Sequence, residues 1–203
     1  VAAKGPSKKL SVDGTAGFGL SISGRTRELR GIGRVDLRQT WISHAVGFRK
    51  PHEVPAAVEF DLLLDPGRGV KVNRFAAEMP PFKVFTKGTL SLEQSHSFDL
   101  EVRIPPVAIR ALPKGLFAVK TSFDAGTVRA QFTATGPLDN WWAAKLKGQA
   151  EIKQAGFKIE GLTAPVEDLT ATFSFVEDRL QVERGTLKIA DSRITATGDV
   201  RGW

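Results

Sequence analysis

Several stretches of this chain of 203 residues alternate apolar and polar side chains with a period of two. Successive side chains of a β-strand point to opposite faces, so this period predicts strands. An antiparallel sheet built from such strands has one apolar face and one polar face. The function then depends on whether the apolar face contacts a second sheet or a ligand. The clearest apolar positions are Phe98, Leu100, Val102 and Ile104; Val128, Ala130, Phe132 and Ala134; and Ala144, Leu146, Gly148, Ala150 and Ile152.

The same alternation covers most of the chain and predicts about eleven or twelve strands separated by turn residues. The expected strands span residues 10–22, 29–41, 54–64, 70–79, 82–92, 97–104, 117–122, 127–135, 143–153, 169–175, 180–189 and 193–200. Turn residues such as Asp65-Pro66-Gly67 and Asp124-Ala125-Gly126 separate many of them. Short helices are expected within residues 105–112 and 137–142. This spacing is typical of a sandwich, a barrel or a long meander.

The composition limits the class of protein. The hydrophobic content of 41% is ordinary for a globular protein, and the chain has no Cys. A disulfide framework and a thiolate metal site are therefore excluded. No apolar run approaches the roughly 18 residues needed to cross a bilayer, and no signal-peptide pattern is present. We expect a single elongated domain over residues 1–203, cut from a longer protein whose anchor or export signal would lie outside it.

The basic charge, +7 overall, does not predict nucleic-acid binding. Arginines gather at Arg25, Arg27, Arg30, Arg34 and Arg38, largely on the polar side of a strand-like stretch. A nucleic-acid surface would need exposed aromatic residues among the basic ones. The aromatic residues instead fall mostly on the apolar positions of the strands. A solvated, mixed-charge face is the better interpretation, and no nucleic-acid partner is expected.

The sequence offers little for catalysis or metal binding. His44, His52 and His96 have no second ligand at metal-binding spacing. Asp99 and Glu101 form a carboxylate pair on the polar face of a predicted strand, where solvent would surround them. No nucleophile-elbow motif is present. We therefore expect no enzyme activity, no metal and no cofactor.

An internal repeat relates two predicted hairpins by a constant offset. Each copy reads strand, tight turn, strand, with a Gly followed two residues later by an apolar residue. Repeats of this kind tend to stack into elongated assemblies. They suggest sub-repeats at residues 54–104 and 165–203. Val72, Arg74, Ala77, Met79, Lys83, Val84, Gly88 and Leu90 align with Val182, Arg184, Leu187, Ile189, Arg193, Ile194, Gly198 and Val200.

The second copy, in residues 184–200, resembles the AsmA-like superfamily of Gram-negative envelope proteins, which includes the bridge-like, TamB-related proteins. Its sequence there is RGTLKIADSRITATGDV. A similar pattern of a glycine within a strand recurs at Lys87-Gly88-Thr89-Leu90 and Lys147-Gly148-Gln149-Ala150. Residues 165–175 fit the segment with which members of the family begin a new hairpin. The resemblance covers about residues 54–203. It consists of strands and glycines rather than of invariant catalytic residues.

The resemblance implies an all-β fold in which a long, twisted antiparallel sheet curls into an open hydrophobic groove. It implies a periplasmic location with an anchor in the inner membrane, although the family's N-terminal membrane helix is not in this sequence. The expected function is to shield phospholipid acyl chains between the inner and outer membranes. The alternative fold is a closed β-sandwich, which has the same alternation. The alternative function is a structural or assembly scaffold for outer-membrane or secreted β-rich proteins, acting through exposed strand edges, with an outer-membrane or envelope protein as partner.

The groove hypothesis predicts that apolar residues of many strands line one continuous face and contact phospholipid or another acyl-chain lipid. The predicted lining residues are Phe82, Val84, Phe98, Leu100, Val102, Ile104, Val128, Phe132, Leu146, Ile152, Phe173, Phe175, Leu187 and Ile194.

Overall fold

A computed structural model describes residues 10–25, 27–44, 49–93, 96–111, 121–159 and 163–201. The described residues form two antiparallel sheets and two single-turn 3-10 helices, η1 (Ile109–Ala111) and η2 (Trp141–Ala143). The small sheet has the order β1 (Leu10–Gly14), β4 (Thr40–His44), β5 (Arg49–Lys50). The large sheet has eleven strands, in the order β14 (Ser192–Arg201), β13 (Arg179–Ile189), β12 (Val166–Glu177), β11 (Lys145–Ile159), β10 (Thr121–Pro137), β9 (Ser97–Ala108), β8 (Phe82–Ser91), β7 (Gly69–Met79), β6 (Ala57–Asp65), β3 (Glu28–Asp36), β2 (Gly17–Arg25).

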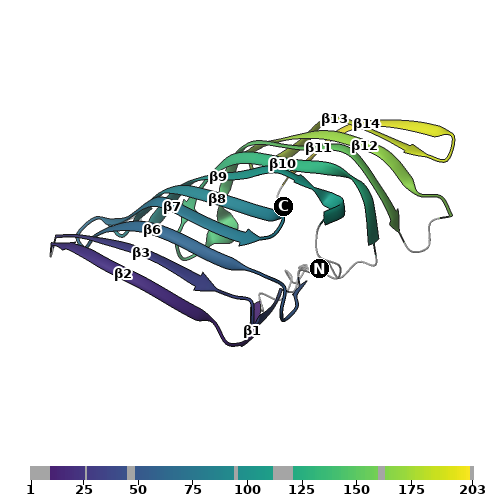
Figure 1. Cartoon of the computed structure of the whole chain (residues 1–203). Coiled ribbons are helices and arrows are strands. Elements are labelled where there is room, and N and C mark those ends of the chain that lie inside the picture. Colours follow the sequence, from purple (N-terminus) through teal and green to yellow (C-terminus); the bar gives the residue numbers. More distant parts are fainter. Residues whose placement is uncertain are drawn as a thin grey trace, which may run out of the picture.

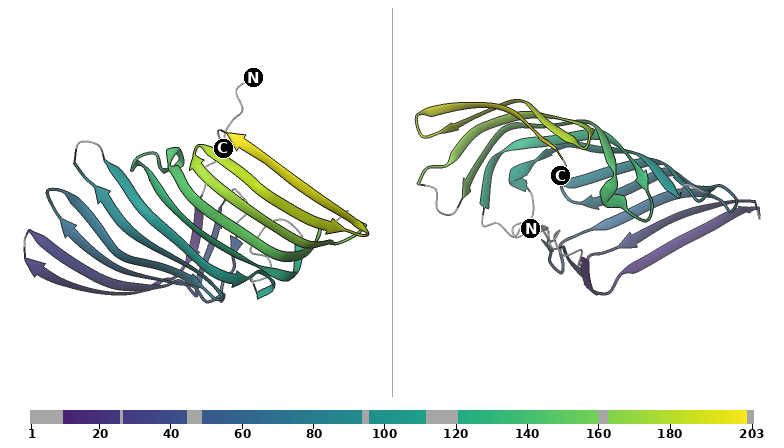
Figure 2. Two further views of the ribbon diagram at one scale, coloured as in Figure 1. Left: turned by 90° about the horizontal axis from the view of Figure 1, so that it is seen from above. Right: turned by 180° about the vertical axis from the view of Figure 1, so that it is seen from behind.

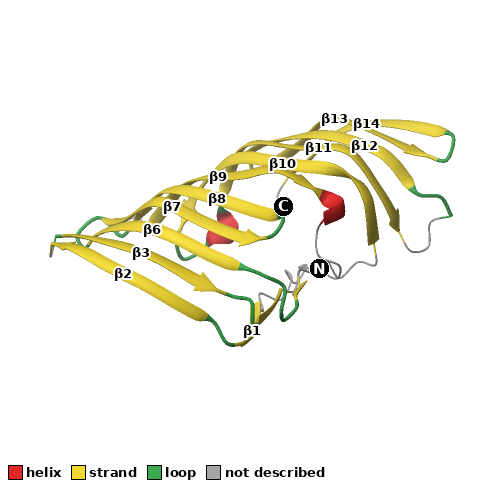
Figure 3. Cartoon of the chain, viewed as in Figure 1, coloured by secondary structure: helices red, strands yellow, loops and turns green. Residues whose placement is uncertain are grey.

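The large sheet is a meander in which strands that follow one another in the chain are neighbours in space. The one departure is between β3 and β6, where β4 and β5 belong to the small sheet. The sheet is arched and twisted, and its edge strands β2 and β14 lie far apart, so it does not close into a barrel (Figures 1 and 2). Strands dominate the secondary structure (Figure 3). The all-β prediction is therefore confirmed.

The predicted strands at residues 10–22 and 29–41 are each split in two, which corrects the sequence analysis. β1 and β4 pair in the small sheet, whereas β2 and β3 pair in the large one. The breaks fall between Gly14 and Gly17 on one strand and between Asp36 and Thr40 on the other. β1 and β2 together with β3 and β4 thus form one long hairpin, which bends at a corner as it passes from the small sheet into the large one. Gly14 permits the corner because its φ is +106° and a Cβ would lie 2.2 Å from the carbonyl oxygen of Gln39.

Bulges interrupt most strands of the large sheet and keep its two faces consistent. On β7 the apolar positions are even-numbered up to Val72 and odd-numbered from Phe75. Val72 pairs with Gly88 and Phe75 with Thr86, so β7 carries one residue more than β8 in this interval. A bulge inserts one extra residue and bends the strand. Val72 and Phe75 consequently lie on the same face despite their odd spacing.

Similar bulges explain two differences from the predicted boundaries. β9 continues through Pro105-Pro106, where the sequence predicted the start of a helix, because these prolines lie in a bulge between Ile104 and Val107. The predicted turn at Asp124-Ala125-Gly126 is wrong. β10 runs through it, with a register shift against β11 on either side of Ala125. The predicted strand at 117–122 lies mostly outside the described residues.

The two hairpins related by the internal repeat pair in the same way, residue for residue. Val72 pairs with Gly88 in one, and Val182 pairs with Gly198 in the other. Each hairpin has a register shift directly after that pair. The glycines themselves differ: Gly88 has a φ of +146° and is tightly enclosed, whereas a Cβ on Gly198 would have no neighbour within 4 Å. The difference follows from position, because β9 covers the outer edge of β8 while β14 is an edge strand.

Few side chains are fully buried, because eleven strands lie in one layer. The buried apolar residues in the described part of the chain are Val72, Ala76, Met79, Phe98, Val107, Ile109, Ala134, Ala155, Val166 and Ala171. A closed sandwich needs a second sheet of similar extent. Of the described strands, only the three short ones of the small sheet lie outside the large sheet. No helix in the described ranges is long and apolar enough to cross a membrane.

Candidate functional site

Directly paired residues in a sheet share a face, so the register identifies the residues of each face across all eleven strands. One row runs from β8 to β14 through residues of mostly apolar type. The neighbouring row runs through smaller ones. The first row is Thr86, Val102, Phe132, Gly148, Phe175, Leu180 and Val200. The second row is Ile104, Ala130, Ala150, Phe173, Val182 and Gly198.

The register brings all fourteen predicted lining residues onto this one face, which we call the apolar face. Phe82 and Val84 join it through their pairing with Met79 and Ala77 on β7. Gly185 pairs with Ala171, which lies on this face. Leu187 is two residues after Gly185 and therefore lies on the same face, as does its partner Ile194. Residues from seven strands, far apart in sequence, thus share a surface.

The apolar face also includes residues that the sequence list missed. They lie on β2 and β3, outside the residues that resemble the family, and on β6 and β7, which lie within that resemblance but were left off the list. Their register places them in line with the predicted residues. They are Phe18, Leu20, Ile22, Leu29, Val35, Val58, Phe60, Leu62, Leu64, Val70, Val72 and Phe75.

The apolar face is exposed at its two edge strands and mostly half-buried between them. On the edge strand β2, Phe18 is 64% exposed and Ile22 is 65% exposed. Val200 on the opposite edge strand is also exposed, and most apolar-face residues of the middle strands are half-buried. Large apolar side chains exposed together on one surface are a typical sign of an interaction site.

Phenylalanine rings lie over glycines of neighbouring strands on this face. The rings of Phe132 and Phe175 contact each other at 5.8 Å between centroids, and Gly148 lies between them in the register. The ring of Phe60 covers Gly33, since a Cβ there would lie 2.4 Å from the ring. Each ring thus fills the space above a residue with no side chain. The apolar face is consequently smoother than a row of upright rings would make it.

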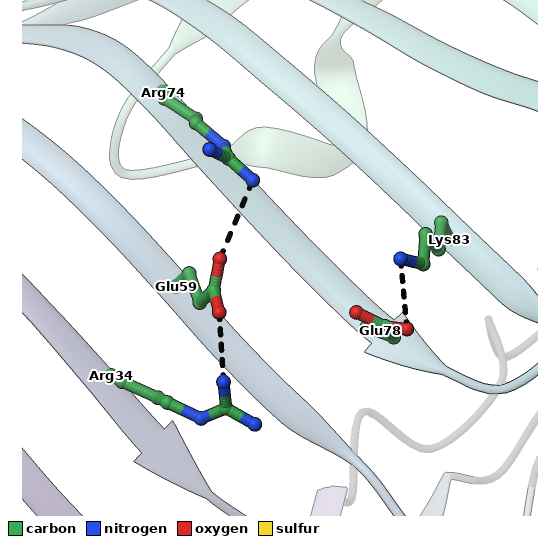
Figure 4. Close-up of polar contacts among 5 residues, drawn as sticks. All are labelled: Arg34, Glu59, Arg74, Glu78 and Lys83. Atoms are coloured by element: carbon green, nitrogen blue, oxygen red, sulfur yellow. Dashed lines mark hydrogen bonds and ion pairs between the residues drawn. The ribbon is translucent and has the colours of Figure 1, made fainter.

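The opposite face is polar and carries cross-strand ion pairs. Glu59 accepts from Arg34 at 2.9 Å and from Arg74 at 3.4 Å, and Lys83 pairs with Glu78 at 2.9 Å (Figure 4). Further pairs follow along the sheet: Lys87–Glu101, Arg129–Glu151, Arg179–Asp199 and Lys188–Glu167. The arginine cluster of the sequence analysis is partly used in this way. Such exposed pairs contribute little each, but they make this face well solvated.

The strongest of these pairs is bidentate. Arg30 donates from Nε at 3.0 Å and from Nη2 at 2.7 Å to the two carboxylate oxygens of Asp61. Its hydrogen bond holds the pKa of Asp61 below its ordinary value, and Asn73 adds a weaker bond in the same direction. Lys153 and Arg129 likewise lower the pKa of Glu151. These carboxylates are therefore charged and engaged at neutral pH, which fits a surface role.

The described residues contain no group of three His, Cys, Asp or Glu side chains placed to hold a metal ion. His52 bonds through Nδ1 to the Gln39 carbonyl oxygen at 3.1 Å, at the corner between the two sheets. His96 has a φ of +34° and lies in the connection between β8 and β9. The apolar face is thus the feature of the described residues that most requires a functional explanation.

Comparisons with protein-family models, with curated proteins and with solved structures gave no match.

Proposed function

We propose that this chain is a lipid-handling segment of a longer envelope protein, in which the apolar face lines an open groove that shields acyl chains. The observation that carries the proposal is the extent of the apolar face, which continues over eleven strands, is exposed at its edge strands and is mostly half-buried between them. A core residue normally loses its exposure to a second layer. Here the apolar side chains share one face from β2 to β14, and most of them keep part of their exposure.

The hand of the chain supports an apolar concave side. Leu37 donates its backbone N–H to Ala56, so the odd-numbered residues of β3 point N–H and C=O toward β6. Consider a strand of L-residues that runs upward, with one side chain pointing at the viewer. The backbone N–H and C=O of that same residue then point to the right. A viewer of the apolar face, which includes Leu29 and Val35, would therefore see β6 to the right of β3.

The left view of Figure 2 looks down on the convex side and has β6 to the left of β3 as that strand runs forward. This arrangement corresponds to the polar face. The apolar face would then be the inner surface of the arch, and the ion pairs would lie on its outer surface.

A passive mechanism suffices for this function. Each methylene removed from water contributes about 0.8 kcal/mol, so a two-chain lipid crosses water slowly but can slide along a continuous apolar track. The headgroup would stay in solvent at the open side of the groove. No catalytic residue is required. By the resemblance, the location would be the periplasm, between an inner-membrane anchor outside this sequence and the outer membrane.

The direct test is native mass spectrometry of the protein purified from a Gram-negative host. We expect bound phospholipid on the parent chain. The Phe132→Asp variant should lose most of it, because a carboxylate would interrupt the apolar track. The matched control is Thr133→Asp, which changes the next residue on the polar face and should keep the lipid.

Phe132→Asp also threatens folding, so circular dichroism must accompany the measurement. Phe18→Asp is the second variant. Phe18 is 64% exposed at the edge of the sheet, so its loss should change stability little while still shortening the track. Absence of lipid from the folded parent, or equal lipid on Phe132→Asp and Thr133→Asp, would rule the proposal out.

The second candidate function, a scaffold for other β-rich envelope proteins, has one observation in its favour. β14 is an edge strand, and every one of its residues is exposed. Its unpaired backbone groups could accept a partner strand. A scaffold of this kind would bind a β-rich partner without carrying lipid, so the same mass spectrometry separates the two candidates.

A further inference from the structure

The corner between the two sheets contains a buried lysine. Lys50 is 2% exposed, and Thr40 beside it is 3% exposed. The Lys50 ammonium donates to the carbonyl oxygens of Thr40 at 2.5 Å, Pro51 at 3.0 Å and Arg38 at 3.3 Å. Lysine has three ammonium donors, and all three are used here on backbone oxygens. Carbonyl groups thus surround the charged end of this side chain.

The accepting carbonyls come from the segments that must be fixed if the corner is to hold its angle. Arg38 lies in the break between β3 and β4, Thr40 is the first residue of β4, and Pro51 follows β5. Ladder hydrogen bonds cannot continue through a bend, so such carbonyls need another donor. One side chain supplies donors to all three. Burial lowers the pKa of Lys50, and the nearby charge of Asp36 acts in the opposite direction.

Further bonds tie the same corner. Thr40 Oγ1 donates to the Thr15 carbonyl at 3.0 Å, and the Thr15 N–H donates to the Gln39 carbonyl at 3.3 Å. Glu53 N–H donates to the Arg38 carbonyl at 2.9 Å. The bend therefore has a defined angle. Gly14 pairs with Thr40 and Gly17 with Asp36, so the bend contains one residue more on the β3–β4 side than on the β1–β2 side.

The bend directs the small sheet toward the inside of the arch. In Figure 1 the small sheet lies below the arch, and in the left view of Figure 2, from above, it lies beneath the middle strands. A straight hairpin would instead extend β2 and β3 beyond the large sheet. The corner thus decides whether this sheet lies across the concave side or clear of it.

We propose that the small sheet is a flap over the concave side of the arch and that the Lys50 ammonium is the latch that holds it there. The position of the flap does not depend on any ligand. Its consequence for ligand access rests on the proposed lipid groove: a latched flap would restrict entry to the groove below the middle strands, and release of the latch would open it.

The flap is tested by a distance between two spin labels, which the absence of Cys makes straightforward. Labels at Ser11→Cys on β1 and Thr133→Cys on β10 span the flap and the arch. The parent should give a narrow distance distribution. Lys50→Met, which keeps the aliphatic stem, should broaden or shift it, and the control Lys71→Met on the polar face should not. A narrow, unshifted distribution in Lys50→Met overturns the latch.

Hydrogen exchange on the unmodified chain keeps the proposal testable if Lys50→Met does not fold. The Thr40 and Glu53 amides, which bond across the corner, should exchange as slowly as the amides of β3. Exchange as fast as that of an exposed loop overturns the latch without any variant.

Access to the groove is measured separately, with a pyrene-labelled fatty acid as the probe. Lys50→Met should speed its release roughly ten- to hundredfold, as expected for loss of a set of charge-assisted hydrogen bonds. An altered label distance without faster release would contradict the gating of the groove. Failure of the parent to bind the probe would contradict the lipid function but not the latch, because the distance measurement needs no ligand.

Discussion

At the scale of single residues, Gly148 is one of the tightly enclosed glycines of the apolar face. Its φ is +152°, and a Cβ would lie 2.3 Å from the Gln131 carbonyl oxygen and 2.4 Å from the Phe132 Cα. Backbone strain and overpacking both follow, so Gly148→Ala should lower the free energy of unfolding by about 2–4 kcal/mol.

Gly198→Ala is the matched control for this substitution. Gly198 is also a strand glycine on the apolar face, but a Cβ there meets nothing within 4 Å. Its free energy of unfolding should change by less than about 1 kcal/mol, in either direction. Urea denaturation of both variants checks the pair. Equal losses would mean that the enclosure of Gly148 is not the cause.

The ion pair of Arg30 with Asp61 predicts a dependence of stability on pH. The pKa of Asp61 is lowered in the folded state, first by its hydrogen bond from Arg30. Such a carboxylate stabilises the fold above its unfolded pKa, and this contribution is lost as the pH falls through the folded pKa. The stability difference between the parent and Asp61→Asn should thus be constant near neutral pH and shrink below about pH 4. Thermal unfolding from pH 7 to pH 3 measures it. A difference that stays constant over this range would contradict the assignment.

At the scale of elements, the bulges explain how the strands bend without exchanging their faces. Deletion of Asn73 would remove the extra residue of β7 and leave Val72, Arg74 and Phe75 in regular alternation. We expect a loss of less than about 2 kcal/mol. Deletion of Lys71, two residues earlier, would shift part of the strand by one residue and exchange its faces. We expect a loss of more than about 4 kcal/mol. Chemical denaturation of both deletions distinguishes a bulge from an ordinary strand position.

Strand positions were predictable wherever alternation was uninterrupted, as in β8 and β14. The bulges were missed, although the sequence contains their signal: the apolar residues of β7 change from even to odd numbers between Val72 and Phe75. The same change occurs between Val182 and Gly185 on β13. The bend between β3 and β4 left no comparable signal. It depends on Lys50, which comes later in the chain and looks like any surface lysine in the sequence.

At the scale of the whole molecule, the sequence predicted which residues share the apolar face but not the shape of that face. Alternation fixes the side of the sheet on which Phe98 or Phe132 lies. The alternating pattern is the same for the core of a sandwich and for the lining of a groove, because both remove alternate residues from water. The difference lies in the number of layers, and that depends on how the connections place each hairpin. Short connections after β6, β8 and β12 add each new strand beside the last and produce a single layer.

The single layer has two open edges, and β14 predicts how isolated copies behave. The hairpin of β13 and β14 has the same register as the hairpin of β7 and β8. In β8 the N–H groups of odd-numbered residues point away from β7, toward β9. The N–H groups of odd-numbered residues in β14 therefore point away from β13, into solvent. An exposed, regular edge with free N–H groups pairs with another chain. Isolated copies should therefore associate edge to edge as concentration rises. Thr197→Pro removes an outward N–H without breaking a bond to β13 and should weaken this association, whereas Thr197→Ala should not. Sedimentation equilibrium measures it, and a strictly monomeric parent, or equal association of both variants, would show that this edge is protected in another way.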